Sequence, residues 1–334
     1  MNDDNRTKMA WAEEISAHLK ERFGLMVLEA FPIDKGWINV KWRMVTDDGL
    51  RFVKFYHPDR YKLHLRPERR SAMENTLQLQ RGLHSNGVPS PQVYLYHGEA
   101  LQQTRSGLIY TLQGWTDGAT LEAGTFSCAQ MADLGEAAGR MHRWLARVPP
   151  ADKLAWQPDK AAYLEEWKNN WQKATEADDQ TVLGWLDRSR ARVAAMDFSL
   201  FENSPTGWLH WDLWSDNLLF RDRRLAAIVD YDRMAMAYPE IDVARAILSG
   251  ALQRGELRSD AVQAFMEGYR AHHPAPPGMV SRAIRMLYLI ESIWWLRADV
   301  RQESELRGLL RRFIEEIQWI EEHMDELAEM LDGA

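Results

Sequence analysis

The stretch that decides the fold reads His-Trp-Asp-Leu-Trp-Ser-Asp-Asn at residues 210–217, and Asp230 follows it within Ile-Val-Asp-Tyr-Asp. The stretch places a carboxylate, Asp212, five residues before a carboxamide, Asn217, and Asp230 falls where a short strand is expected to end. Phosphoryl transfer needs a carboxylate that accepts a hydroxyl proton, and amide and carboxylate oxygens that hold Mg²⁺ on nucleotide phosphates. We therefore expect Asp212 to be the catalytic base and Asn217 and Asp230 to be the metal ligands.

Two neighbouring residues are expected to support this segment without taking part in the chemistry. His210 is expected to hold the loop by hydrogen bonding. Asp242 lies near the start of a predicted helix, in Pro-Glu-Ile-Asp-Val-Ala-Arg. Its carboxylate has two compatible roles, either as a helix N-cap that accepts backbone amides or as a group that reaches back to the catalytic loop.

Lys54 lies in Phe-Val-Lys-Phe-Tyr, in the middle of an apolar strand. Burying an ammonium group is unfavourable unless an anion compensates it. Nucleotide phosphates would compensate it, so we predict that Lys54 is a phosphate ligand. The alternative is a lysine on the solvent face of a half-buried strand. An acidic partner is expected on the following helix, at Glu74, with Glu68 as the alternative.

Further nucleotide contacts are expected from two other segments. Residues 34–39 lie between the first two expected strands, where a loop would cover the phosphates, and Gly36 allows close backbone approach. Gly36 and Asn39 are assigned to nucleotide binding on this basis, although a plain hairpin turn would explain the segment too. Gln113 begins the stretch that is expected to connect the two domains, and it completes the nucleotide-binding set.

The length of 334 residues and a hydrophobic content of 46% predict two domains with substantial cores. Alternating apolar residues and turn signals predict an N-terminal, strand-rich region with strands at 37–45, 51–56, 92–96 and 108–112 and helices at 8–23 and 68–85. Helical patterns dominate after Gly114, at 128–146, 160–176, 180–196, 242–253, 258–271, 279–299 and 303–331. The predicted fold is therefore α+β, with a small antiparallel-sheet lobe (1–114) and a larger helical lobe (115–334).

Charge and cysteine content exclude several classes of protein. Cys128 is the only cysteine, which excludes a disulfide framework and a cysteine-based zinc site and fits a cytoplasmic protein. Residues 1–114 hold 16 Lys and Arg against 13 Asp and Glu, and the remainder holds 25 against 36, so no broad basic face for nucleic acid is expected. An acidic second lobe would attract a cationic substrate, although an ordinary solvated surface explains it too. No membrane-spanning segment is expected. The heptad-like apolar seam in 303–331 fits internal packing in a monomer or a homodimer contact.

Six motifs occur in the order in which they occur in a known family. They are Val53–Tyr56, Gly87–Pro91, Leu134–His142, His210–Asn217, Ile228–Tyr231 and Asp242–Ala244. Together they resemble the aminoglycoside phosphotransferase/choline kinase family, a branch of the protein-kinase-like fold, whose signature also separates Asp and Asn by four residues. The resemblance implies transfer of a phosphoryl group from ATP or GTP, with Mg²⁺, to a hydroxyl group of a small molecule.

Two departures from that family concern the acceptor. Trp211 stands where the family usually has glycine, and Ser215-Asp216 replaces Pro-Gly, so the family's substrates are not carried over. Residues 34–42 and 53–56 are also similar to the spore-coat-associated kinases of the superfamily. Fifteen tryptophans, among them Trp294 and Trp295, would allow an aromatic cage for a cation, although most such residues belong to cores.

The leading prediction is thus a small-molecule kinase, and three alternatives stay open. The first is a spore-coat-type kinase that acts on a protein hydroxyl, and the second is a nucleotide-binding scaffold of low activity. The third is a hydrolase with a metal bound by His210, Asp212 and Asp216, which leaves Lys54 and Asp230 without a role.

Overall fold

The computed structural model describes residues 2–33 and 40–331, and the chain forms two compact units. The first unit comprises Met1–Gly118 together with Ala226–Asp232, and the second comprises Ala119–Leu225 together with Arg233–Ala334. This division differs from the boundary drawn at residue 114, because the short segment that carries Asp230 groups with the N-terminal residues. The predicted α+β class is confirmed, with a five-stranded antiparallel sheet and a mostly helical second unit.

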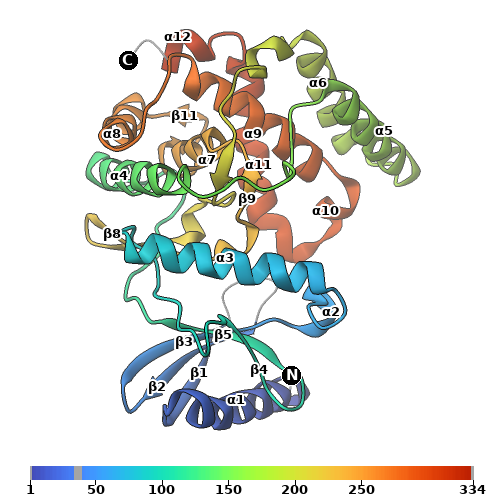
Figure 1. Ribbon diagram of the computed structural model, residues 1–334. Coiled ribbons are helices and arrows are strands. Elements are labelled where there is room, and N and C mark those ends of the chain that lie inside the picture. Colours follow the sequence, from blue (N-terminus) through green and yellow to red (C-terminus); the bar gives the residue numbers. More distant parts are fainter. Residues whose placement is uncertain (1, 34–39, 332–334) are drawn as a thin grey trace. The chain divides into compact units, whose positions relative to one another are not determined.

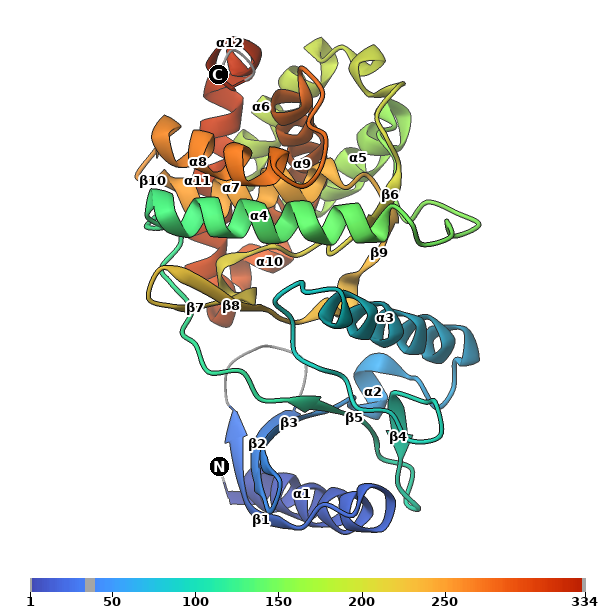
Figure 2. The ribbon, with the colours of Figure 1, turned by 60° about the vertical axis from the view of Figure 1, so that its left-hand side comes forward.

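The first unit is built on a sheet with the strand order β1-β2-β3-β5-β4 (Figure 1). Its strands are β1 (Val27–Ile33), β2 (Val40–Thr46), β3 (Gly49–Phe55), β4 (Leu101–Gln103) and β5 (Ile109–Gly114). Helix α1 (Asn2–Phe23) lies on one side of this sheet, and α3 (Pro67–Ser85), which follows the short α2 (Pro58–Tyr61), lies on the other, as Figure 2 shows. Two apolar clusters hold these layers together, because side chains alternate between the two faces of each strand.

One strand prediction is wrong, and the reason is local. Residues 92–96 form only isolated bridges, at Val93 and Tyr96, whereas the edge strand is β4 at Leu101–Gln103. His97 and Gly98 both have positive φ, so the chain reverses tightly between Tyr96 and Glu99 before β4 begins. The two glutamines of β4 weakened its apolar pattern in the sequence.

The second unit is dominated by helices that agree closely with the predicted ranges. They are α4 (Cys128–Leu145), α5 (Lys160–Glu176), α6 (Gln180–Ala195), α7 (Glu240–Ala251), α8 (Ser259–Arg270), α9 (Met279–Trp295), α10 (Ala298–Gln302), α11 (Arg307–His323) and α12 (Leu327–Leu331). The single helix predicted at 303–331 is therefore interrupted, and its apolar seam is buried within the unit, at Ile317, Ile320 and Leu327 among others. Among the described residues, no helix is both long enough and apolar enough to cross a membrane.

Short strands in this part of the chain lead into and out of the candidate site. Strand β6 (Gly207–Leu209) ends directly before the 210–217 stretch. It pairs antiparallel with β9 (Ala235–Ala237). Strands β7 (Leu218–Arg221) and β8 (Arg224–Ile228) follow the stretch, and a further two-stranded pair is formed by β10 (Leu252–Gln253) and β11 (Glu256–Leu257). Every residue of α7 is buried, so this helix forms the centre of the unit.

Helices α4 and α8 approach each other so closely that glycine is required at their contact. A Cβ atom at Gly135 would lie 2.0 Å from the carbonyl oxygen of Phe265, and one at Gly139 would lie 2.6 Å from that of Tyr269. From the opposite side, a Cβ atom at Gly268 would lie 2.2 Å from a carbonyl oxygen of α4. Since all three contacts are with backbone atoms, no side chain could move aside, and this explains the Leu-Gly motif at 134–135.

Candidate active site

In the first unit, Lys54 is held between two carboxylates. Its Nζ lies 2.7 Å from Oδ1 of Asp230 and 2.7 Å from Oδ2 of Asp232. The lysine side chain is only 4% exposed, which excludes the solvent-facing alternative. Burial alone lowers the pKa of Lys54, but Asp230 and Asp232 outweigh this effect and raise the pKa well above its usual value. Lys54 is therefore a fixed positive charge.

A second lysine lies beside the first. Lys41 is directly opposite Lys54 in the β2–β3 register, and its Nζ lies 3.7 Å from Oδ2 of Asp230. Burial lowers the pKa of Lys41, and Asp230 offsets only part of this effect. The sequence analysis missed both Lys41 and Asp232. The cross-strand position of Lys41 and the Asp-Tyr-Asp spacing were the signals that could have identified them.

The expected pairing of Lys54 with Glu74 is corrected by the structure. Oε1 of Glu74 accepts a hydrogen bond from the backbone N–H of Ala100, and Oε2 accepts one from that of Leu101, each at 2.8 Å. Glu74 thus satisfies two backbone donors at the entrance to β4, and the carboxylates at 230 and 232 take the role that it was assigned. The alternative, Glu68, is exposed in the first turn of α3.

Of the other predicted nucleotide contacts, Gln113 lies among the described residues. Gln113 is buried on β5, where its Oε1 accepts a hydrogen bond from Nε2 of Gln80 at 3.0 Å. Gly36 and Asn39 lie outside the described residues. Their roles and that of Gln113 stay predictions.

In the second unit, the side chain of Asp242 binds the backbone of the 210–217 stretch. Its Oδ2 accepts a hydrogen bond from the N–H of His210 at 2.7 Å, and its Oδ1 accepts one from that of Trp211 at 2.8 Å. Helix α7 begins at Glu240, two residues earlier, with Pro239 at its N-cap. Asp242 is therefore not an N-cap, and of its two suggested roles the structure shows the second. Nε2 of His142 on α4 lies 3.1 Å from Oδ2 and completes the contacts of this fully buried carboxylate.

Asp212 and Asn217 are brought together by the short turn between them. Nδ2 of Asn217 donates to the backbone oxygen of Asp212 and to its Oδ2, both at 3.0 Å. The amide is thereby oriented with its oxygen available to a cation. Nδ1 of His210, a fully buried side chain, accepts a hydrogen bond from the N–H of Asp212 at 3.2 Å, in agreement with a supporting role.

Each of the two expected metal ligands, taken by itself, has the chemistry of a Mg²⁺ ligand. The amide oxygen of Asn217 and the carboxylate of Asp230 are hard oxygen ligands, which Mg²⁺ prefers. Among residues 2–33 and 40–331, no group of three or more His, Cys, Asp or Glu side chains is arranged to hold a metal ion. Few protein ligands are expected if phosphate oxygens and water complete the coordination of the ion.

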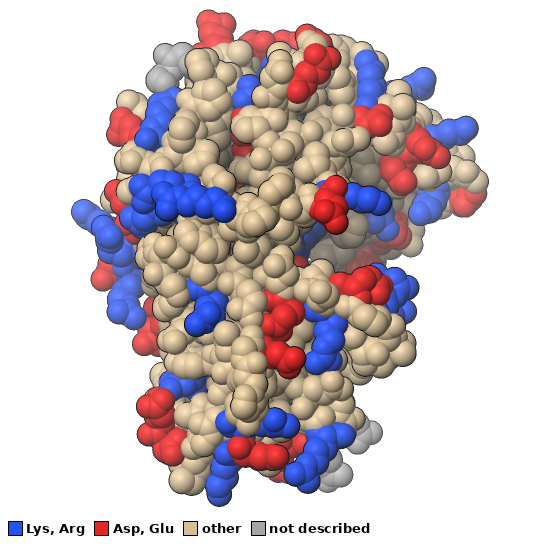
Figure 3. All heavy atoms as spheres, in the orientation of Figure 1, with Lys and Arg blue, Asp and Glu red and all other residues tan. Residues whose placement is uncertain are grey.

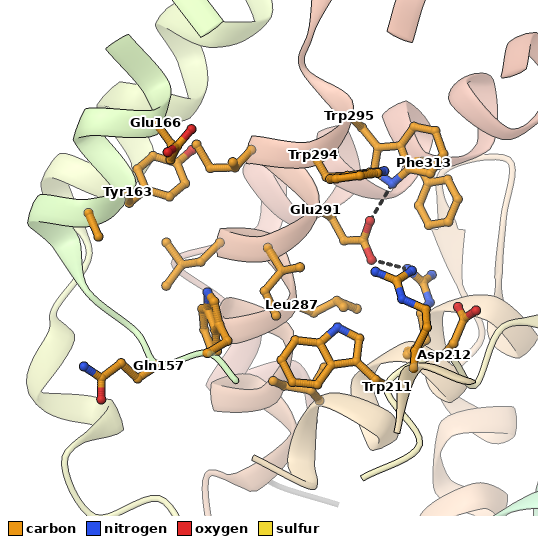
Figure 4. Close-up of a pocket in the computed structure, with 18 of the residues that line it drawn as sticks. Gln157, Tyr163, Glu166, Trp211, Asp212, Leu287, Glu291, Trp294, Trp295 and Phe313 are labelled. Atoms are coloured by element: carbon orange, nitrogen blue, oxygen red, sulfur yellow. Dashed lines mark hydrogen bonds and ion pairs between the residues drawn. The ribbon is translucent and has the colours of Figure 1, made fainter. Parts of the chain in front are cut away.

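Asp212 also lines a pocket of about 370 Å³ within the second unit (Figure 4). In this view Trp211 and Leu287 lie to the left of Asp212, and Trp294, Trp295 and Phe313 lie above these three residues. Glu166 and Tyr163 come from α5 on the side away from Asp212. The pocket is the size of the smaller ligand sites in proteins, and its lining is mainly aromatic and aliphatic.

A buried arginine that the sequence did not reveal contributes to this pocket. The guanidinium of Arg245 is paired with Glu316 and lies 3.4 Å from Oε1 of Glu291. It lies near the rings of Trp214 and Phe313, whose centroids are 5.0 and 5.1 Å away and which stack on each other. Burial alone lowers the pKa of Arg245, but the two glutamates outweigh it and raise the pKa.

The charges on one face of the molecule are mixed. In Figure 3, Lys and Arg side chains alternate with Asp and Glu side chains over the helices of this view. Among the described residues drawn there, neither sign forms a continuous field.

Comparisons with known proteins identify the family of the chain. Residues 29–278 match the model of a family described as the phosphotransferase enzyme family. A homoserine kinase from Mesorhizobium japonicum is 22% identical over 228 residues, which cover 66% of this chain and 69% of that protein.

Solved structures establish the fold. The chain is similar to amicoumacin kinase hAmiN in complex with AMP-PNP, Ca²⁺ and Ami, with a TM-score of 0.63 and 14% identity over 95% of this chain and 96% of that chain. An aminoglycoside phosphotransferase from Alicyclobacillus acidocaldarius subsp. acidocaldarius gives a TM-score of 0.63 at 13% identity, over 92% and 93% of the two chains. The kinase-like fold predicted from the motifs is confirmed, while the spore-coat branch stays a prediction.

Proposed function

The chain belongs to the phosphotransferase enzyme family, and from this premise we propose that it transfers the γ-phosphoryl group of ATP to a hydroxyl group of a small molecule, with Mg²⁺. Transfer to an alcohol group is the reaction of the kinases that the chain resembles, and the homoserine kinase relative acts on such a group by its name. The complex of amicoumacin kinase with AMP-PNP supports ATP as the donor.

In this proposal, Asp212 orients the acceptor hydroxyl and accepts its proton as the new bond from oxygen to phosphorus forms. The bond from the γ-phosphorus to the oxygen of the β-phosphate breaks, and ADP leaves. Asn217 and Asp230 would hold Mg²⁺, which would neutralise charge on the phosphate oxygens. Lys54 supplies a positive charge for the phosphates, because Asp230 and Asp232 keep it protonated.

The observation that carries the proposal is the fixed orientation of the Asp212–Asn217 pair. Asp242 accepts a hydrogen bond from the backbone of the loop, and the side-chain amide of Asn217 donates one to Asp212. Asp212 also lines a ligand-sized pocket. A carboxylate, a neighbouring amide and a ligand-sized pocket thus occur together in one unit, which supports the proposed roles.

The test measures ADP release from Mg²⁺-ATP with a panel of hydroxyl compounds. Asp212→Asn is expected to lower kcat by about 1,000-fold or more and to leave the affinity for a nonhydrolysable ATP analogue unchanged, because the amide cannot accept the proton. Asp230→Ala should weaken binding of the metal–nucleotide complex as well. Asp216→Asn is the matched control, since Asp216 is an exposed acid of the same loop.

Other outcomes would favour the alternatives. Equal activity of the Asp212→Asn variant and the wild type contradicts the assignment of the base. Tight nucleotide binding without ADP release on any acceptor indicates a binding scaffold. Release only in the presence of a protein substrate indicates a protein kinase, and GTP in place of ATP tests the donor.

A further inference from the structure

Trp211 adopts a backbone conformation that tryptophan rarely occupies. Its φ is +71°, in the left-handed region that glycine enters without strain. For a bulky residue this conformation costs about 1–3 kcal/mol and persists only where surrounding contacts impose it. Glycine would avoid this strain, so the presence of tryptophan at position 211 needs a physical explanation.

The contacts that impose the strain belong to the catalytic loop. Asp242 accepts hydrogen bonds from two successive backbone amides, those of His210 and Trp211. The N–H of Asp212 then turns back to Nδ1 of His210. These three bonds fix the turn whatever side chain occupies position 211, so glycine would form it more easily. The reason for tryptophan at this strained position therefore lies in its indole side chain and not in the turn.

The indole of Trp211 forms a wall of the pocket that Asp212 lines. In Figure 4 its ring lies to the left of Asp212 and below Leu287, and the aromatic residues of α9 and α11 lie above it. A ligand whose hydroxyl approached Asp212 would therefore have its adjoining atoms against this ring. Apolar and ring-shaped groups gain most from such a surface.

Arg245 and Glu291, two of the polar residues that line the pocket, are engaged by the protein itself, whereas Gln157 and Glu166 lie on the side away from Asp212 and Arg233 is a further cation of the lining. Glu291 lies beside Arg245 and accepts a hydrogen bond from Nε1 of Trp295 at 2.5 Å. Arg245 is also paired with Glu316. At the other end, Asp159 accepts hydrogen bonds from two backbone amides at the start of α5.

A molecule with many hydroxyl groups would therefore lose hydrogen bonds to water and find few replacements near Asp212. Each such buried group is unfavourable by about 1–3 kcal/mol. The volume of about 370 Å³ also restricts the ligand to a compact molecule.

From these features we infer that Trp211 selects the acceptor and that the acceptor is a compact alcohol with an apolar, ring-sized body. This inference rests on the proposed function, since it names the substrate class of the same site. The indole packs against the apolar body, and the hydroxyl group lies toward Asp212. Trp211 is thus a specificity-determining residue that touches the substrate.

The experiment uses 2-phenylethanol as the apolar probe, with homoserine and glucose as polar acceptors. Binding is measured by thermal shift and by quenching of tryptophan fluorescence, and transfer is measured by ADP release. The wild type is expected to bind 2-phenylethanol and to show a higher kcat/KM for it than for either polar acceptor.

Trp211→Gly separates specificity from stability, because it removes the ring and also relieves the backbone strain. We expect the Kd for 2-phenylethanol to rise about tenfold while the Tm stays equal or increases. Trp211→Phe should retain most of the affinity. Trp208→Ala, in the adjoining strand and outside the pocket lining, should bind the probe as the wild type does.

Each remaining outcome is decisive. An unchanged Kd in Trp211→Gly, a large fall in its Tm, or a preference of the wild type for glucose or homoserine would overturn the inference. Binding of 2-phenylethanol that depends on Trp211, without ADP release on any acceptor, would contradict the proposed function and leave the binding site intact.

Discussion

The Lys54 cluster and the 210–217 loop hold their charged groups in different ways. In the first unit, Lys54 contacts two carboxylates at 2.7 Å, so ion pairs carry the arrangement. In the second, Asp242 binds backbone amides, and no cation of comparable charge lies against it apart from His142 when protonated. Among the described residues, one region is thus stabilised by charge balance and the other by hydrogen bonds to the main chain.

This difference determines how each region responds to a ligand. A cation between carboxylates can exchange a protein partner for a phosphate oxygen, because both are anions. Backbone amides bound to a buried carboxylate have no such substitute, and they keep the loop in one shape. We therefore expect the first region to adjust on nucleotide binding and the second to stay fixed.

The largest effect is expected from Lys54→Met. The change leaves Asp230 and Asp232 without their buried cation, at a cost of about 3 kcal/mol in the free energy of unfolding, and kcat/KM for ATP should fall about 1,000-fold. Because the pKa of Lys54 is raised on folding, its contribution is fully present below pH 10.5 and is lost only as the pH rises through the higher folded value. Chemical denaturation and ADP release measure the two effects.

Two further variants control this experiment. Lys20→Met removes an exposed lysine of the same unit and should change neither quantity. Adding Asp232→Asn to Lys54→Met should recover part of the stability without the activity. Full recovery of activity in the double variant would contradict the assignment of Lys54 to the phosphates.

A smaller effect is expected from Asp242→Asn. The amide nitrogen cannot accept a hydrogen bond, so the N–H of His210 or of Trp211 is left without a partner, and the turn that positions Asp212 loosens. We expect kcat to fall about 100-fold with an unchanged Kd for the ATP analogue, whereas a purely structural role would lower stability alone. Asp187→Asn, an exposed acid on α6, is the control.

The smallest effect concerns pH. Burial raises the pKa of Glu291 above its usual 4.5. Between pH 4.5 and the higher pKa of Glu291 in the folded protein, the folded protein binds a proton that the unfolded chain has released. The free energy of unfolding therefore falls as the pH rises through this window. Glu291→Gln should flatten this part of the profile, and the exposed Glu322→Gln should not. An unchanged slope of unfolding free energy against pH in Glu291→Gln would show that other groups produce it.

Local signals predicted most of the fold and the central residues of the site. Helical periodicity located most of the helix ends of the second unit to within a few residues, and the Asp-x₄-Asn spacing identified Asp212 and Asn217, which the structure joins by hydrogen bonds. Their chemical roles, and that of Asp230 as a metal ligand, stay predictions.

What the sequence failed to predict depends on distant contacts. The partner of Lys54 was sought on the next helix, but the structure supplies it from Asp230 and Asp232, more than 170 residues away. The burial of Arg245 was not predicted, because the glutamates that balance its charge lie on α9 and α11. No local sequence pattern indicates such a distant pairing. Strand β4 was missed because its two glutamines weaken the apolar pattern, and Glu74 of α3, which binds the backbone N–H of Leu101 at its start, is distant in the sequence.

The glycine contact between α4 and α8 has a consequence for the loop. His142 lies two turns beyond Gly135 on the same rigid helix, and its ring reaches both the hydroxyl of Tyr269 on α8 and the carboxylate of Asp242. The depth to which α4 settles on α8 therefore sets where this imidazole meets Asp242. The absence of two methyl groups on α4, at positions 135 and 139, thus helps to determine the geometry of a candidate site that neither glycine touches.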